Sequence, residues 1–345
     1  MRVGILTHPQ AINYGGILQC YALSTYLEKM GHKAIVIRRE QDTVWYKLLL
    51  SPIVKKIRLR KLLHPRQIDK GAQIRPFSEK YLNRTSSIKT RKVMLHACEK
   101  YKLDAVIVGS DQVWRADFAM LYGYNYFLDF VPTGIKRLSY AASFGLSEWK
   151  YNTEQTLHIK ELLSRFQGIS VREEDAIQLC HKYLGVEVEK MIDPTMLLSA
   201  TEYNSLSSPK LINEKYVFVY WLGDVTQIER QINEYQEKGY IIIRVGLREE
   251  KLLPSVEEWL SYIKYAEVVI TDSFHGCVYT ILFHRPLKVC ENQSGGYGRI
   301  KSLFDALGVS VAQMEKPSND TFDMIEGRLD SLRKKSHHFL QSTLV

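Results

Sequence analysis

The chain has 345 residues, of which 45% are hydrophobic and 25% are charged, and its net charge is +9. This composition is that of a globular protein with a large core, and it excludes collagen-like, disordered and disulfide-rich classes. Because single hydrophobic cores stop growing near ~250–300 residues, the length favours two domains.

The longest uncharged apolar runs, such as 216–222 and 277–283, are far shorter than the ~20 residues that span a bilayer. The apolar start at 1–6 lacks the longer run and the cleavage site of a signal peptide. Five scattered cysteines, an odd number without a Cys-x-x-Cys pair, indicate neither a disulfide framework nor a structural zinc site. We therefore expect a cytoplasmic protein whose cysteines are mostly small core residues.

Apolar runs and turn residues alternate along the chain in a strand–helix pattern. In the first part this pattern predicts helices after the glycine pair 15–16 and over 172–184, and strands at 3–6, 34–37, 105–108, 138–144, 168–171 and 190–192. In the second part it predicts helices at 226–238, 256–265 and up to residue 283, and strands at 216–221, 240–245, 268–271 and 287–289. Such alternation is typical of parallel sheets with helices on both faces.

A cluster of polar residues, Pro and Lys at 198–213 indicates a domain boundary. We therefore expect an α/β protein with two domains, an N-terminal one over 1–205 and a C-terminal one over 206–320. A last helix, about 322–340, lies in the segment 321–345 and is free to pack back on the N-terminal domain.

A basic segment occupies 45–76. Between Lys47 and Arg75 nine basic residues alternate with apolar ones, against the single acid Asp69. This is the pattern of a basic amphipathic helix, which can lie on an anionic membrane surface. An ordinary surface helix, with its apolar stripe on the domain and its charges in water, is the simpler reading of the pattern alone. No motif that reads nucleic acid accompanies the charge, so we expect no nucleic-acid partner.

Ligands of parallel α/β folds bind beyond the carboxyl ends of the strands, and four loops at such ends carry polar residues. The first, Asn13-Tyr14-Gly15-Gly16, opens a helix. Its glycines and free N–H groups suit a close approach to an anion, but paired glycines also form ordinary tight turns. The loop lacks the third glycine of a dinucleotide-binding fingerprint.

The second and third loops follow strands 105–108 and 168–171. In Gly109-Ser110-Asp111-Gln112-Val113-Trp114, Asp111 is a candidate for accepting a hydroxyl proton, with Ser110 and Gln112 as further polar groups and Trp114 as an aromatic wall. Alternatively, Ser110 or Asp111 only caps the next helix. Arg172 suits a carboxylate or phosphate ligand, but three acids follow it, so a salt bridge is an equal alternative.

The fourth loop, Thr271-Asp272-Ser273-Phe274-His275-Gly276, joins a β-branched strand to a helix. Ser273 and the N–H groups that follow it can face an anion at the helix start. His275, beside such an anion, titrates in the range that a general acid needs at neutral pH. A single histidine is nevertheless more often structural than catalytic.

The chain resembles the polysaccharide pyruvyl transferase family over about residues 1–310. The matching motifs occur in the family's order: Asn-Tyr-Gly-Gly at 13–16 with Gln19, Tyr21, Ala22 and Leu23, then 109–114, Ser-Val-Arg-Glu at 170–173, Asp-Pro-Thr at 193–195 and Ser-Phe-His-Gly at 273–276. The resemblance implies a GT-B glycosyltransferase-like architecture, with two Rossmann-like domains and a central cleft. It also implies transfer of the enolpyruvyl-derived group of phosphoenolpyruvate to a sugar of a cell-surface polysaccharide precursor, which forms a pyruvate ketal with release of phosphate.

The family's general acid falls on His275, and an arginine associated with the donor's anionic groups falls on Arg172. Several relatives carry arginine where this chain has Ser273, so a donor-binding cation is expected elsewhere, at Arg299 or Lys288. For the base that takes the hydroxyl proton, Asp111 is the first candidate and Asp272 the second.

On this basis we expect the substrates to contact Arg172, Ser273, Phe274, Gly276, Arg299, Asn13, Tyr14, Gly15, Gly16, Ser110, Gln112 and Trp114. We expect no metal and no cofactor, with phosphoenolpyruvate serving as the donor substrate. The acceptor is expected to be linked to polyprenyl diphosphate, with segment 47–75 holding the protein at the inner face of the cytoplasmic membrane. The alternatives are a nucleotide-sugar-dependent GT-B glycosyltransferase and a non-catalytic membrane-associated partner in polysaccharide assembly.

Overall fold

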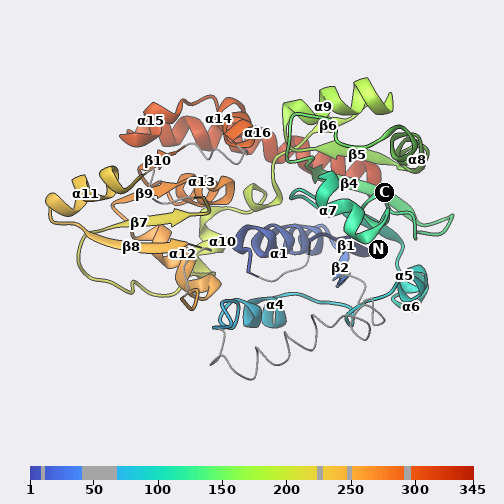
Figure 1. Cartoon of the computed structure of the whole chain (residues 1–345), viewed down its shortest axis with the longest axis horizontal. Coiled ribbons are helices and arrows are strands. Elements are labelled where there is room, and N and C mark those ends of the chain that lie inside the picture. Colours follow the sequence, from blue (N-terminus) through green and yellow to red (C-terminus); the bar gives the residue numbers. More distant parts are fainter. Residues whose placement is uncertain (9–11, 41–67, 224–227, 247–250, 291–296) are drawn as a thin grey trace, which may run out of the picture.

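The structure, a computed structural model, describes residues 1–8, 12–40, 68–223, 228–246, 251–290 and 297–345. It contains two parallel β-sheets, one of six and one of four strands, with helices around both (Figure 1). Most of the basic segment, residues 45–67, lies outside the described residues. Within the described part of the chain, no helix is long and apolar enough to cross a bilayer.

The six-stranded sheet has the order β2-β1-β3-β4-β5-β6. Its strands are β1 (Arg2–Leu6), β2 (Lys33–Val36), β3 (Ala105–Val108), β4 (Lys136–Ala142), β5 (Gly168–Val171) and β6 (Glu189–Lys190). The central strand β3, Ala-Val-Ile-Val, is buried throughout, as an unbroken apolar run in a parallel sheet covered on both faces must be.

The helices of this part are α1 (Tyr14–Lys29), α4 (Arg75–Tyr81), α5 (Arg91–Leu95), α6 (Ala97–Lys100), α7 (Ala116–Ala119), α8 (Thr153–Leu163), α9 (Glu174–Leu179) and α10 (Ala200–Leu206). Shorter turns are η1 (Met120–Tyr122), η2 (Asn125–Phe127), the π-helical η3 (Cys180–Leu184) and η4 (Pro194–Met196). The helix expected over 172–184 is thus divided into α9 and η3.

The four-stranded sheet has the order β10-β9-β7-β8. Its strands are β7 (Tyr216–Trp221), β8 (Ile241–Gly246), β9 (Val268–Thr271) and β10 (Leu287–Val289). The helices that follow or cover them are α11 (Glu229–Glu237), α12 (Val256–Lys264), α13 (Phe274–Leu282), α14 (Tyr297–Leu307), α15 (Val311–Glu315) and α16 (Asn319–Leu344). Each strand expected from the sequence is present; half of them have the expected ends, and the ends of the others are shifted by one or two residues.

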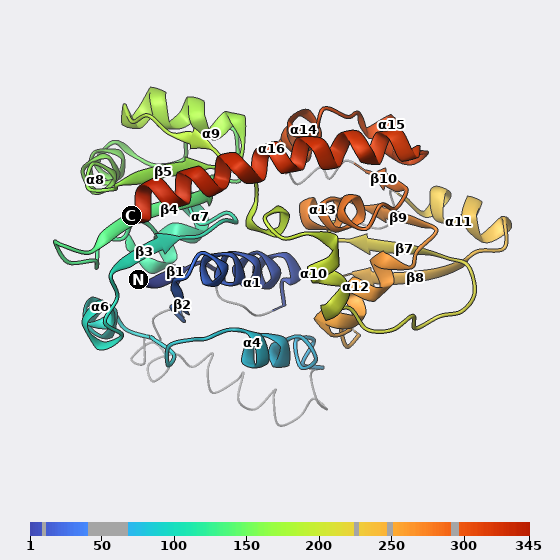
Figure 2. The ribbon, with the colours of Figure 1, turned by 180° about the vertical axis from the view of Figure 1, so that it is seen from behind.

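Two elements join the two sheets. Helix α1 lies between them (Figure 1). Its Tyr14 ring stacks on Trp259 of α12 with centroids 4.9 Å apart. The 26-residue helix α16 begins beside the second sheet and ends beside β4 (Figure 2). There Lys136 Nζ donates to the carbonyl of Leu344 at 2.7 Å. One core cluster accordingly contains buried residues from both sheets.

Candidate active site

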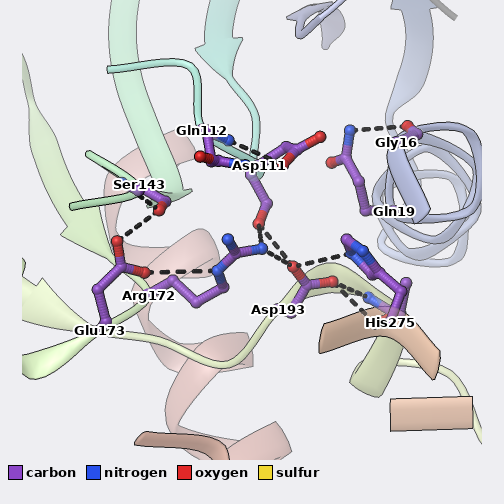
Figure 3. A network of polar contacts seen from close by, with 12 residues as sticks. Gly16, Gln19, Asp111, Gln112, Ser143, Arg172, Glu173, Asp193 and His275 are labelled. Atoms are coloured by element: carbon purple, nitrogen blue, oxygen red, sulfur yellow. Dashed lines mark hydrogen bonds and ion pairs between the residues drawn. The ribbon is translucent and has the colours of Figure 1, made fainter. Parts of the chain in front are cut away.

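Loops from both sheets converge at the carboxyl ends of β3, β5, β6 and β9 (Figure 3). Asp193, which follows β6, lies at the centre of the cluster and has no exposed surface. Its Oδ2 accepts hydrogen bonds from Ser110 Oγ and from Arg172 Nη1, both at 2.7 Å. Its Oδ1 accepts from the backbone N–H of Thr195 at 3.0 Å and from the hydroxyl of that residue at 2.8 Å.

Asp193 carries a negative charge that its surroundings stabilise. Burial alone would raise the pKa of this carboxyl, but His275 and Arg172 hold it far below its usual range. His275 Nε2 lies 3.6 Å from Asp193 Oδ2. One buried carboxylate therefore faces both the histidine and the arginine that the sequence singles out.

Arg172 is 5% exposed and only partly engaged by this network. Its Nε lies 3.5 Å from Glu173 Oε2, and its guanidinium lies over the ring of Phe274, 4.5 Å from the centroid. Burial opposes the charge, but Asp193 and Glu173 raise the pKa of Arg172 above its usual value. Nη2 is buried without a hydrogen-bond partner among the described residues. The salt-bridge alternative is thus present, yet one N–H group remains for a ligand.

His275 occupies the first turn of α13, which Ser273 caps by accepting the backbone N–H of Gly276 at 3.3 Å. The imidazole packs directly on the start of α1. A Cβ atom at Gly15 would come within 1.9 Å of His275 Nδ1, so no other residue type fits there without displacing the ring. The glycine pair of the first loop therefore makes room for the histidine of the fourth.

Asp111 joins the first and second loops. Its Oδ2 accepts from Asn13 Nδ2 at 3.3 Å, and Asn13 also caps α1 by accepting from the N–H of Gly16 at 3.1 Å. Burial alone would raise the pKa of Asp111, but its neighbours, first His8 and then His275, lower it below its usual value. Asp111 has a positive φ of 78°, so its backbone is held in the sparsely populated left-handed region beside this cluster.

A pocket of about 200 Å³ adjoins the cluster between β6, α14 and α16. Arg172, Asp193 and Phe274 form its wall next to the cluster, and Arg299 of α14 also lines it. Burial, and then the neighbouring Arg172, lowers the pKa of Arg299, and its Nε is buried without a hydrogen-bond partner in the described part of the chain. Lys288 is not among the lining residues of this pocket.

Two of the expected substrate contacts, Trp114 and Tyr14, have structural partners in the core. Trp114 has no exposed surface, and its indole N–H donates to the carbonyl of Tyr126 at 2.9 Å, so it is a core residue and not a wall of the site. Tyr14 is equally buried, and its hydroxyl donates to the carbonyl of Pro254 at 2.7 Å, so it joins the two sheets. Both residues are the kind of aromatic side chain that cores and ligand sites share.

Other expected site residues have structural partners of their own. The carboxylate of Asp272 accepts the backbone N–H groups of Leu222 and Gly223 at 2.8 and 2.9 Å, which fixes the turn after β7. Ser110 is fully buried and holds Asp193. At Gly276 a Cβ would come within 2.5 Å of Thr271 Oγ1, so this glycine allows α13 to pack closely on β9.

Gln112 accepts from Arg115 Nη1 at 3.2 Å at the rim of the site. From the sequence, no site role was expected of Asp193 or His8, although Asp193 begins the Asp-Pro-Thr motif at 193–195. Among the described residues, no group of three or more His, Cys, Asp or Glu side chains is placed to hold a metal ion.

The family model of polysaccharide pyruvyl transferases matches residues 13–294, which is most of the chain. The chain belongs to the polysaccharide pyruvyl transferase family. The match includes every loop of the cluster around Asp193. A search of curated protein sequences finds no significant match.

Solved structures similar to this family member come from distant proteins. A structure from Listeria monocytogenes, described as that of a UDP-N-acetylglucosamine 2-epimerase, has a TM-score of 0.51 at 10% identity, covering 96% of this chain and 90% of its own. The UDP-GlcNAc 2-epimerase of Methanocaldococcus jannaschii has a TM-score of 0.47 at 14% identity, covering 98% and 100%. The Streptomyces glycosyltransferase SsfS6, complexed with thymidine diphosphate, has a TM-score of 0.47 at 11% identity, covering 99% of each chain. The fold of the Listeria monocytogenes structure is thus shared by this chain, whose α/β architecture with two parallel sheets is as expected.

Proposed function

We propose that this chain transfers the enolpyruvyl-derived group of phosphoenolpyruvate to a sugar hydroxyl of a polysaccharide precursor and closes a pyruvate ketal. The observation that carries the proposal is the position of His275. It lies at the start of α13, 3.6 Å from a buried carboxylate and beside Arg172. This supports a general acid next to a site for an anionic donor.

Donor binding needs cations for a carboxylate and a phosphate. Arg172 Nη2 and Arg299 Nε are buried N–H groups without hydrogen-bond partners among the described residues, and both side chains line the same pocket. An anion that accepts from both would restore their lost hydrogen bonds and offset the repulsion between the guanidinium groups. Arg299 thus supplies the cation that Ser273 does not.

In the first step, His275 gives a proton to C3 of phosphoenolpyruvate, which makes C2 electrophilic. A sugar hydroxyl then attacks C2 and loses its proton to Asp111. The lowered pKa of Asp111 makes it a weak base, but the hydroxyl oxygen, once bonded to C2, carries the positive charge and is strongly acidic. The bond between C2 and the phosphate-bearing oxygen then breaks and releases phosphate, which leaves C2 cationic again, and a second hydroxyl of the same sugar attacks C2. Its proton leaves with the phosphate, which closes the ketal.

We further propose that the acceptor is linked to a polyprenyl diphosphate and that the protein works at the inner membrane surface. The support is the basic, apolar pattern of 47–75. Purified protein should be incubated with phosphoenolpyruvate and candidate lipid-linked sugars, and the masses of the products should be measured by mass spectrometry. A pyruvate-ketal mass gain with equal release of inorganic phosphate is expected; sugar transfer from a nucleotide sugar instead would favour a glycosyltransferase.

A further inference from the structure

A second charged pocket, of about 300 Å³, lies at the carboxyl ends of β1 and β2 in the N-terminal sheet. Arg38, Arg75 and Arg84 line it together with His8. Two acids, Glu40 and Glu79, also line the pocket, so its walls carry more positive than negative charge. A fourth arginine, Arg39, is held in the core, where Nε donates to Asn125 Oδ1 at 2.8 Å.

The pocket arginines differ in how far they are already engaged. Arg38 Nη2 contacts Glu40 Oε1 at 3.2 Å, and Arg75 Nη1 contacts Asp69 Oδ1 at 2.9 Å. Arg84 has no hydrogen-bond or ion-pair partner within the described ranges. Burial, followed by the nearby Arg38, lowers the pKa of Arg84 below its usual value. An anion bound between Arg38 and Arg84 would relieve this unfavourable arrangement.

His8 connects this pocket to the active-site cluster. It follows β1, lines the pocket, and has a buried Nε2 without a hydrogen-bond partner among the residues described. Its ring is held edge-on to Phe118 and Tyr126, with centroids 5.6 and 5.2 Å away. His8 also contributes to the lowered pKa of the Asp111 carboxyl. It therefore links the pocket to the proposed base.

We infer that this pocket binds the phosphate or diphosphate group of an anionic sugar acceptor, with Arg38 and Arg84 on the phosphate and His8 toward the sugar. The inference rests on the proposed function, because Arg172 and Arg299 already serve the donor's anions on the other side of the cluster. A neutral acceptor would need no further arginines. Lipid-linked sugars and nucleotide sugars both carry such a phosphate group, and the inference concerns the phosphate group alone.

Binding can be measured without turnover, by titration calorimetry with inorganic pyrophosphate as the probe. The parent protein should bind pyrophosphate in two sites. Arg84→Gln and Arg38→Gln should each weaken one site at least tenfold, and Arg172→Gln should weaken the other. Arg38 is 40% exposed, so its replacement tests the pocket even where that of the more buried Arg84 disturbs folding. Arg230→Gln is the matched control, because the Arg230 side chain on α11 is 93% exposed and lies in neither pocket. It should change neither site.

Farnesyl diphosphate and UDP distinguish the two sources of the phosphate. Preference for farnesyl diphosphate at the Arg38–Arg84 site indicates a lipid-linked acceptor, and preference for UDP indicates a nucleotide-linked one; both support a phosphate site. Equal pyrophosphate binding by the parent, Arg38→Gln and Arg84→Gln proteins would overturn the inference. Because the assay needs no pyruvyl transfer, a failure of the proposed function leaves this result readable.

Discussion

The imidazole of His275 lies in the space that a side chain at Gly15 would fill. An added Cβ would come within 1.9 Å of Nδ1, far inside any real contact distance. The two residues are 260 positions apart in sequence. Gly15 lies at the start of α1 and His275 at the start of α13, which follow strands of different sheets. The position of the proposed acid is therefore set by the contact between the two halves of the molecule.

Gly15→Ala should displace His275 and lower turnover by about 10²-fold, the scale expected when a general acid is misplaced. The fold should persist, since the imidazole can move toward the site. Gly327→Ala is the matched control, because a Cβ at Gly327 meets nothing within 4 Å. In a helix this change should, if anything, add up to about 1 kcal/mol of stability. Steady-state kinetics and urea unfolding measure both effects; equal turnover of parent and Gly15→Ala proteins would contradict the contact.

Asp193→Asn should make the stability less dependent on pH. The folded-state pKa of Asp193 lies below the unfolded one, so its contribution is present above about pH 4 and is lost as the pH falls toward the folded value. Removing the carboxylate leaves Arg172 less compensated, which costs about 3–5 kcal/mol for a broken buried pair at neutral pH. Urea unfolding of both proteins at a series of pH values should show the difference shrinking between about pH 5 and 3. If the difference in unfolding free energy between the two proteins stayed constant with pH, the Asp193 carboxylate would not be the group that makes stability depend on pH.

Arg299→Gln should raise the KM for phosphoenolpyruvate by about tenfold or more, because a charge-assisted hydrogen bond to the donor is lost. Lys288→Gln is the comparison, since Lys288 does not line the pocket beside Arg172. Its KM should stay within twofold of the parent value. KM is measured by phosphate release. A larger rise in KM for Lys288→Gln than for Arg299→Gln would place the donor-binding cation on β10.

The protein should sediment with anionic liposomes at low salt and be released at high salt, since charges are screened beyond about 8–10 Å at physiological ionic strength. Replacing Lys55, Lys56, Arg58, Arg60 and Lys61 by Gln should abolish sedimentation and spare activity on a short-chain soluble acceptor. Neutral liposomes serve as the control. Sedimentation of the substituted protein equal to that of the parent would contradict membrane binding by 47–75.

Strand positions were predictable because central strands of parallel sheets are buried on both faces and read as unbroken apolar runs, as in β3 and β7. The residues at which strands end were less predictable. The run at 138–144 suggested a strand to residue 144, but β4 ends at Ala142 because Ser143 N–H turns to the carbonyl of Asp111. Helix α8 was not predicted, although Asn152 and Gln155 form its capping box and signal its start.

Which site residues meet was predictable only in part. The loops bearing Asp111 and Arg172 converge because the strand ends of one parallel sheet share an edge, whereas His275 comes from the second sheet. The role of Asp193 depends on partners from three other strand ends, which no local pattern encodes. The burial of Trp114 likewise depends on Tyr126 and the ring of Phe127, which a loop motif cannot reveal.

The central claim is that His275 protonates the methylene carbon of phosphoenolpyruvate during ketal formation. The most direct measurement is the reaction in deuterated water, followed by mass spectrometry and NMR of the product. The account predicts one solvent-derived deuterium in the ketal methyl group, and turnover lowered by about 10²–10⁴-fold in a folded His275→Ala protein. A methyl group without solvent deuterium, or near-parent turnover without the imidazole, would contradict it.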